Sequence, residues 1–335
     1  MYLARPSSPM EYTRLGSTGL EVSRLCLGCM NFGDGEPWMI GNRAASISLI
    51  HRALDGGINF LDTANVYSDG ESEEIVGEAI ESRRRDELVV ATKVYWDTHD
   101  GPNGSGLSRK HIIDQAYASL DRLGVDYIDL YQIHRFDEET PVEETLSALT
   151  HLVDEGVVRY VGASTMTAYE FTKLLYTADA GGYERFVSMQ PEYNAVDRHE
   201  EANVLPACAG EDVGVIPWSP LAGGFLSGKY DPDGEVPEGT RAADDDYTRD
   251  RFTDENWAVL SELQSVADER GVSTAQVALA WLLERPVVDA PIIGPRTEAH
   301  LDDALGAVDV SLSAAEVERI AEPKTPRWPA PGKDT

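Results

Sequence analysis

Lysine is scarce in this sequence. Its 335 residues contain six lysines, at positions 93, 110, 173, 229, 324 and 333, among 28 lysines and arginines in total. Aspartate and glutamate together number 59, which gives a formal net charge of −31. Because such a chain repels the phosphates of nucleic acids, we expect no nucleic-acid partner.

Long apolar runs and cysteines are also few. No stretch approaches the 18 or so uninterrupted apolar residues of a membrane span, and the first residues lack the apolar centre of a secretory signal. We therefore expect a cytoplasmic protein with no membrane partner. Cys26 and Cys29 have redox or metal-pair spacing, but no second Cys or His pair accompanies them. Together with Cys208, they are interpreted as buried, reduced thiols, and no metal is expected.

Eight short β-like runs alternate with helical stretches along the chain. The runs are residues 23–28, 59–63, 88–94, 127–134, 158–164, 186–190, 214–220 and 290–294. The expected helices are 44–55, 71–84, 108–123, 142–155, 168–178, 200–210, 256–270, 273–284 and 299–306, with N-caps at Ser108 and Asp254 among them. Several runs are apolar on both faces, as buried parallel strands are. The pattern predicts an α/β fold, a (β/α)8 TIM barrel.

Segments outside the repeating pattern complete the expected architecture. Residues 12–22 predict an N-terminal β-hairpin that turns on residues 17–19 and closes the bottom of the barrel. Residues 229–256 are irregular and follow the seventh strand, where they could form a lid. We expect a single domain over residues 1–335, with a core of about 11–324 and a flexible tail over 325–335. A doubly wound sheet is the rival fold, but Gly28–Gly33 lacks its G-x-G-x-x-G fingerprint.

Four residues that could carry chemistry follow the expected strands. Asp62, Lys93 and His134 stand at three strand ends, and Tyr67 follows in the loop after the second strand. Each alone has a structural explanation, as a cap or a satisfied core residue. The carboxyl ends of barrel strands share one rim, however, so all four are expected to converge there.

Together these residues suit the reduction of a carbonyl group. Charge develops on the carbonyl oxygen when hydride reaches the carbon, and the oxygen then needs a proton. Tyr67 is the expected donor, Lys93 would favour loss of its proton, and Asp62 would hold the ammonium of Lys93. His134 would orient the carbonyl oxygen.

Several segments closely resemble the aldo-keto reductase family, over about residues 11–324. They are NFLDTANVY (59–67), GESEEIVG (70–77), ATK (91–93), DLYQIHR (129–135), VRYVGAS (158–164), QPEYN (190–194) and WSPLAGG (218–224). The likeness is greatest to a bacterial and archaeal branch related to potassium-channel β-subunits. It implies that Asp62, Tyr67, Lys93 and His134 form the catalytic tetrad of an NAD(P)H-dependent reductase of aldehydes, ketones or sugar carbonyls.

The resemblance also implies contacts along a bound dinucleotide. Those at the nicotinamide and its ribose are Gly28, Cys29, Met30, Asp62, Ser164, Gln190 and Trp218. Those at the pyrophosphate are Ser219, Pro220, Leu221, Gly223 and Lys229, and those at the adenosine end are Gly294, Arg296, His300 and Asp303. The fork of Arg296 suits a 2′-phosphate, so NADPH is the expected cofactor. NADH stays possible, because His300 and Ala304 replace the usual Gln and Asn of the family.

The loops after the strands set the small-molecule carbonyl substrate in this family, and the substrate itself is not readable from the sequence. Trp96, Arg135 and Phe136 are expected at the substrate, and Trp38 and Tyr193 are further candidates. Arg135 would either favour an acidic or polyhydroxy substrate or pair with Asp137. The oligomeric state is equally open. An alternative function is an NADP(H)-binding regulator with little turnover, although channel β-subunits carry Asn where this chain has His134.

The acidic composition generates a hypothesis about habitat. Many carboxylates and few lysines suit a cytoplasm at very high salt, where ions screen the self-repulsion of the chain. The alternative is an ordinary acidic enzyme. If the protein is halophilic, its free energy of unfolding in urea should rise from dilute buffer to molar KCl. Maximal stability in dilute buffer would exclude the halophilic interpretation.

Overall fold

A computed structural model describes residues 10–326. It contains an eight-stranded sheet in which every neighbouring pair is parallel, in the order β10-β3-β4-β5-β6-β7-β8-β9. The strands are β3 (Cys26–Gly28), β4 (Phe60–Asp62), β5 (Val89–Val94), β6 (Ile128–Ile133), β7 (Val158–Ser164), β8 (Ser188–Gln190), β9 (Gly214–Val215) and β10 (Ile292–Ile293). Each lies within one of the eight runs expected from the sequence.

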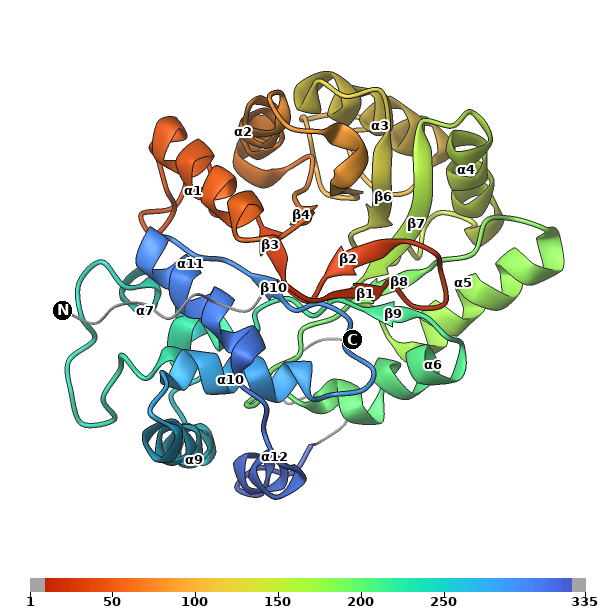
Figure 1. The fold of residues 1–335 in the computed structure, drawn as a ribbon. Coiled ribbons are helices and arrows are strands. Elements are labelled where there is room, and N and C mark those ends of the chain that lie inside the picture. Colours follow the sequence, from red (N-terminus) through yellow and green to blue (C-terminus); the bar gives the residue numbers. More distant parts are fainter. Residues whose placement is uncertain (1–9, 327–335) are drawn as a thin grey trace.

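The sheet curls until its two ends meet. Val215 in β9 forms a parallel bridge with Val288, and the amide of Ile292 donates to the carbonyl of Pro217 at 2.9 Å. Figure 1 shows the helices arranged around this sheet. The predicted (β/α)8 barrel is therefore confirmed.

The expected helices are present with small shifts at their ends. They are α1 (Arg43–Asp55), α2 (Glu71–Ile80), α3 (Arg109–Leu123), α4 (Val142–Asp154), α5 (Ala168–Gly181), α6 (Val204–Gly210), α9 (Asp254–Arg270), α10 (Thr274–Leu283) and α11 (Glu298–Leu305). Short 3-10 turns are η1 (Tyr67–Gly70), η2 (Arg85–Glu87), η3 (His199–Ala202), η4 (Ala222–Ser227) and η5 (Gly306–Asp309). Ser108 caps α3 as predicted, because its hydroxyl accepts from the amide of His111. The expected cap at Asp254 is wrong by one residue, since Thr253 caps α9.

Three helices were not anticipated. α7 (Arg241–Asp244) and α8 (Asp246–Arg249) lie in the segment expected to be irregular, and α12 (Ala314–Ala321) follows η5. α12 begins with a capping box in which the Ser313 hydroxyl and the Glu316 carboxylate satisfy each other's backbone amides. The helix packs against α9. The tail expected from residue 325 lies almost wholly outside the described residues.

The predicted hairpin is present and plugs one end of the barrel. β1 (Tyr12–Arg14) pairs antiparallel with β2 (Glu21–Ser23), and the hairpin crosses the middle of the view in Figure 1. Leu15 and Val22 are fully buried and join Cys26 and Phe60 in the apolar cluster inside the barrel. A second, larger cluster fills the space between the sheet and the helices. Burial of Leu15 and Val22 explains why this end of the barrel is closed.

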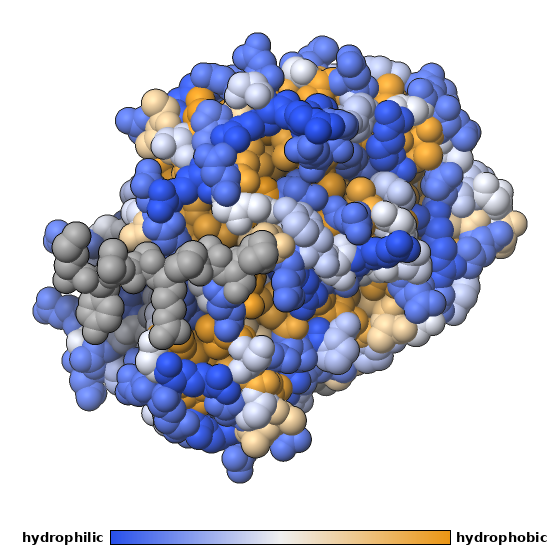
Figure 2. Space-filling model, in the orientation of Figure 1, coloured by the Kyte–Doolittle hydropathy of each residue, from blue (hydrophilic) through white to orange (hydrophobic). Residues whose placement is uncertain are grey.

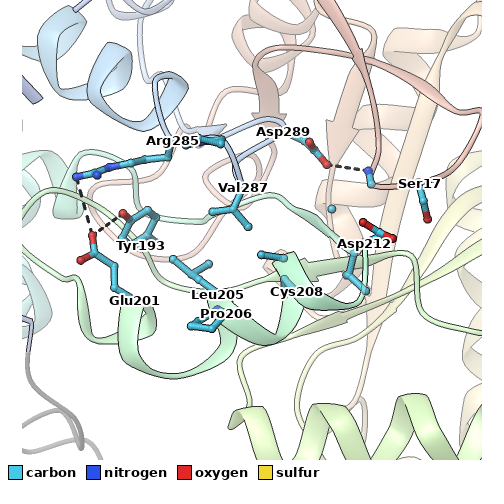
Figure 3. A pocket seen from close by; sticks show the side chains of 15 residues that line it. Ser17, Tyr193, Glu201, Leu205, Pro206, Cys208, Asp212, Arg285, Val287 and Asp289 are labelled. Carbon is cyan, nitrogen blue, oxygen red and sulfur yellow. Dashed lines mark hydrogen bonds and ion pairs between the residues drawn. The ribbon is translucent and has the colours of Figure 1, made fainter. Parts of the chain in front are cut away.

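Polar contacts fasten the hairpin to the neighbouring loops. The amide of Gly16 donates to Asp289 at 2.8 Å, and Figure 3 draws this bond at one edge of a hollow bordered by α6. At the other edge, the Glu201 carboxylate accepts from the Tyr193 hydroxyl at 2.8 Å and lies 3.9 Å from Arg285. Tyr193, a further candidate for the substrate site, is instead buried on the hairpin side of the barrel, against Trp281.

The surface around the hairpin is largely hydrophilic (Figure 2), as expected for a chain with 59 aspartates and glutamates. In Figure 2, hydrophilic side chains cover most of the hairpin face, and hydrophobic side chains show mainly in the recesses between elements. Among residues 10–326, no helix combines the length and apolar character needed to cross a bilayer. The three cysteines are buried and carry free thiols, as expected.

Candidate active site

A cavity of about 580 Å³ opens at the carboxyl ends of the strands, opposite the hairpin. At its centre it is lined by Asp62, Tyr67, His134, Ser164 and Gln190, which come from or follow four different strands. Parallel strands place their carboxyl ends at one rim, and this explains why residues far apart in the sequence meet here. Lys93 lies beneath the cavity wall and is fully buried.

A chain of short contacts joins Asp62, Lys93 and Tyr67. The Lys93 ammonium donates to Asp62 Oδ2 at 2.6 Å, to the carbonyl of Thr63 at 2.8 Å and to the Tyr67 hydroxyl at 3.2 Å. These three bonds use all three protons of the ammonium. The Tyr67 oxygen accepts from Lys93, which leaves its own proton available to an acceptor in the cavity.

Two glutamines hold the Asp62 carboxylate from the other side. Gln132 in β6 and Gln190 in β8 each donate an amide N–H to Asp62 Oδ1 at 2.9 Å. Gln190 also donates to Gln132 at 3.2 Å. Sequence reasoning missed Gln132, although a buried amide side chain near the carboxyl end of a strand is the signal that could have revealed it.

Burial and charge compete at Tyr67 and Lys93. Desolvation of the hydroxyl raises the pKa of Tyr67 above its ordinary value, and the Lys93 ammonium opposes this only in part. Desolvation also disfavours the charge of Lys93, but Asp62 and Tyr67 outweigh it and raise the pKa of Lys93. Lys93 therefore acts on Tyr67 in the expected direction, yet Tyr67 is a protonated phenol at neutral pH.

His134 lies beside Tyr67, where it is buried and close to the cations Lys93 and Arg135. Burial lowers the pKa of His134 well below its usual value, and Lys93 and Arg135 lower it further. The ring meets Tyr67 edge to face, with centroids 5.9 Å apart, and Trp96 at 6.2 Å. His134 is thus a neutral imidazole, with one ring nitrogen that donates a hydrogen bond and one that accepts.

Unusual backbone conformations cluster around this site. Ser68 and Asp69, directly after Tyr67, have φ of 50° and 53°. Thr165 and Ser219, next to Ser164 and Trp218, have φ of 41° and 52°. Left-handed conformations cost energy for residues with side chains and concentrate at functional sites.

One wall combines Trp218 with polar groups. The Trp218 indole donates to the Thr165 hydroxyl at 3.1 Å, and its ring lies 6.2 Å from that of Tyr247. The Ser164 hydroxyl donates to the carbonyl of Gln190 at 2.9 Å. Tyr247 lies in α8, in the segment that follows β9. Arg251 anchors this segment through ion pairs with Glu192 and Asp197.

Another part of the cavity is lined by Lys229, Arg241 and Arg296. Arg241 pairs with Asp245 at 2.7 Å, and burial lowers the pKa of the nearby His300, so that among residues 10–326 Lys229 and Arg296 carry the free positive charge. Burial lowers the pKa of Lys229, and the neighbouring Arg296 and Arg241 lower it further. In so acidic a chain, such a concentration of cations fits a phosphorylated ligand.

Glycine shapes the same part of the cavity. Gly223 and Gly224 have positive φ, and a Cβ atom at Gly224 would lie 2.7 Å from Lys229 Nζ. The backbone here follows a path that residues with side chains adopt only with strain. A cavity lined by Trp218 as well as by Lys229 and Arg296 offers a ring surface for a nicotinamide and cations for the phosphates of a dinucleotide.

The remaining sequence candidates divide into two groups. Those that also line the cavity are Gly28, Met30, Trp38, Trp96, Arg135, Pro220, Leu221, Gly294 and Asp303. Cys29 and Phe136 are not among the lining residues: Cys29 is fully buried, and Phe136 packs against the core. Within the described chain, no three His, Cys, Asp or Glu side chains are arranged to hold a metal ion.

Comparison with known proteins agrees with this geometry. Residues 24–324 match the model of the Aldo/keto reductase family. Versiconal hemiacetal acetate reductase of Aspergillus parasiticus is 39% identical, over 97% of this chain and 100% of its own length. A putative aryl-alcohol dehydrogenase of Schizosaccharomyces pombe is also 39% identical, over 95% and 97%. A probable voltage-gated potassium channel subunit beta of Arabidopsis thaliana is 37% identical, over 95% and 98%.

Proposed function

Because the chain belongs to the aldo/keto reductase family, we propose that it reduces aldehydes, ketones or sugar carbonyls with NADPH and uses Tyr67 as the proton donor. The observation that carries this proposal is the Tyr67 hydroxyl, held by Lys93 at the cavity centre with its proton uncommitted. The reverse reaction would oxidise the corresponding alcohol. The expected site of this chemistry is the cytoplasm.

The proposed mechanism divides the work among four side chains. NADPH, when bound, supplies a hydride. Tyr67 donates its proton to the carbonyl oxygen as charge develops there, and the Lys93 ammonium stabilises the resulting phenolate at 3.2 Å. Asp62 keeps Lys93 charged and in place. His134, a neutral imidazole, hydrogen-bonds and orients the same oxygen.

Residues along the cavity would hold the cofactor. Trp218 offers a flat surface for the nicotinamide, with Ser164 and Gln190 beside it for the carboxamide. Lys229 and Arg296 would bind phosphates. Arg296 forms no ion pair within residues 10–326 and donates only to the carbonyl of Gly239, at 3.3 Å. Its fork is therefore free to bind a 2′-phosphate, which would favour NADPH over NADH.

A regulatory role with little turnover is the second candidate, since one relative is named as a channel subunit. The contacts among Asp62, Lys93 and Tyr67 support turnover instead. NADPH oxidation measured with a panel of aldehydes separates the two functions.

Replacement of Tyr67 by Phe tests the proton donor. The variant should lose about 10²–10⁴-fold in kcat, the usual contribution of a general acid, while its dissociation constant for NADPH stays within about threefold. Stopped-flow turnover and fluorescence titration measure the two quantities. Tyr160→Phe, which removes a hydroxyl away from the cavity, is the matched control. Turnover retained in Tyr67→Phe would refute the assignment.

Replacement of Arg296 by Ala tests cofactor choice. Loss of a charge-assisted contact to the 2′-phosphate should raise KM for NADPH about tenfold or more and leave KM for NADH nearly unchanged. Steady-state kinetics with both cofactors measure this. The control is Arg319→Ala, in α12, where the arginine pairs with Glu262 and Glu269. An unaltered preference between NADPH and NADH would exclude the role of Arg296.

A further inference from the structure

Arg135 stands out from the other arginines of this acidic chain. Most of them pair with carboxylates, as Arg43 does with Glu78 and Arg122 with Glu73. Arg135 forms no ion pair with any residue between 10 and 326. It is nevertheless half-buried and lines the active-site cavity. A cation taken partly out of water without a carboxylate is costly, and an anionic ligand would offset that cost.

The local contacts of Arg135 leave most of its donors unused. Nη1 donates to the carbonyl of His134 at 2.6 Å, and the guanidinium lies 5.3 Å from the centre of the Trp96 ring. No other hydrogen bond joins the guanidinium to the described part of the chain. Of its five N–H donors, four are available to a ligand. The carbonyl and the ring hold the group in place without neutralising it.

Asp137, the sequence neighbour that could have neutralised Arg135, is occupied elsewhere. Its carboxylate accepts from the amides of Leu107 and Glu139 and from the Thr140 hydroxyl. These bonds lower the pKa of Asp137 against the effect of its burial. Arg135 does not pair with Asp137, so an acidic or a polyhydroxy substrate is left of the alternatives open from the sequence. Because no carboxylate of residues 10–326 neutralises the guanidinium, the acidic substrate is favoured.

Arg135 lies close to the proposed reacting groups. Its guanidinium is 5.3 Å from the centre of the Trp96 ring, which packs edge to face against His134, and the His134 ring in turn meets that of Tyr67. The cations proposed for the cofactor phosphates form a separate group, in which Arg296 and Arg241 act on Lys229. An anion bound by Arg135 therefore belongs to the substrate.

Two aromatic side chains accompany Arg135 in this part of the cavity. Trp96 and Tyr67 both line the cavity and pack edge to face against the His134 ring, and Trp96 is 43% exposed. Flat apolar rings exposed at a cavity mouth favour a planar aromatic ligand, which stacks on them and removes them from water. Trp96 and Arg135 follow the neighbouring strands β5 and β6. Trp96 provides the ring surface, and Arg135 provides the positive charge.

We propose that this site selects aromatic aldehydes or ketones that carry a carboxylate, and that Arg135 binds the carboxylate. The planar guanidinium fork matches a carboxylate through two parallel hydrogen bonds. The inference rests on the proposed reductase function and specifies its substrate class. Arg135 acts in recognition only, and the proton still comes from Tyr67.

The test is a ratio that is independent of overall activity. For wild type, Arg135→Gln and Arg135→Lys, kcat/KM is measured with 3- and 4-carboxybenzaldehyde and divided by that for the corresponding methyl esters. We expect Arg135→Gln to lower this ratio about tenfold or more for the better isomer, because a charge-assisted contact is lost. Arg135→Lys keeps the positive charge but lacks the planar fork, so its ratio should lie between those of wild type and Arg135→Gln. An Arg135→Gln ratio within twofold of wild type would overturn the proposal.

Arg159 provides a matched control. It also forms no ion pair among the described residues, donates to one carbonyl, that of Gly156, at 2.8 Å, and lies over one ring, that of Tyr127, at 4.3 Å. It is not among the residues that line the cavity. Arg159→Gln should keep the wild-type ratio, and a fall equal to that of Arg135→Gln would contradict specific recognition by Arg135.

A binding measurement separates failure of this inference from failure of the reductase function. Calorimetry with NADP⁺ present gives the dissociation constants of 3- and 4-(hydroxymethyl)benzoate and of their methyl esters. If wild type oxidises NADPH with no aldehyde of the panel, the reductase proposal fails, and the binding ratio still decides the role of Arg135. If wild type reduces other aldehydes but neither carboxybenzaldehyde, the proposed substrate class is overturned and the reductase function stands. If wild type reduces both and neither ratio changes in Arg135→Gln, only the role of Arg135 is overturned.

Discussion

The ammonium of Lys93, fully buried against the Asp62 carboxylate, is the constraint on which the site depends. A buried charge is tolerated only when it is paired and its protons are used, and Lys93 meets both conditions through Asp62, Thr63 and Tyr67. The barrel supplies the geometry, because β4 and β5 are parallel neighbours and their carboxyl ends meet. Breaking such a pair leaves an uncompensated charge, at a cost of about 3–5 kcal/mol. Stability and chemistry therefore depend on the same contacts.

Charge is distributed unevenly between the surface and the cavity. The chain carries a net charge of −31, and most of its arginines are engaged with carboxylates. The cavity reverses this pattern, with Lys229 and Arg296 as one group of cations and Arg135 separate from them. Cations left without carboxylates in so acidic a protein indicate where anionic ligands bind. On this account the group serves the cofactor phosphates and Arg135 a substrate carboxylate.

Much of this arrangement could be predicted from the sequence, because a barrel places every strand end at one rim. Asp62, Lys93 and His134 were found in this way, and the apolar runs located all eight strands. Tyr193 was misplaced, since position after a strand does not determine which way a side chain turns. Gln132 was missed because its role depends on a partner 70 residues away. Burial raises the pKa of Tyr67 and Lys93 lowers it, so the direction of the shift depends on how deeply packing buries the hydroxyl. No sequence pattern encodes that depth.

The protonation state of Tyr67 tests the central claim most directly. With [ζ-13C]tyrosine, the NMR signal absent from Tyr67→Phe identifies this residue in the free enzyme. The account predicts a phenol throughout the neutral range, a pKa above the ordinary value of about 10 for tyrosine, and a still higher pKa in Lys93→Met, which lacks the opposing ammonium. A phenolate near pH 8, or the same pKa with and without Lys93, would contradict it.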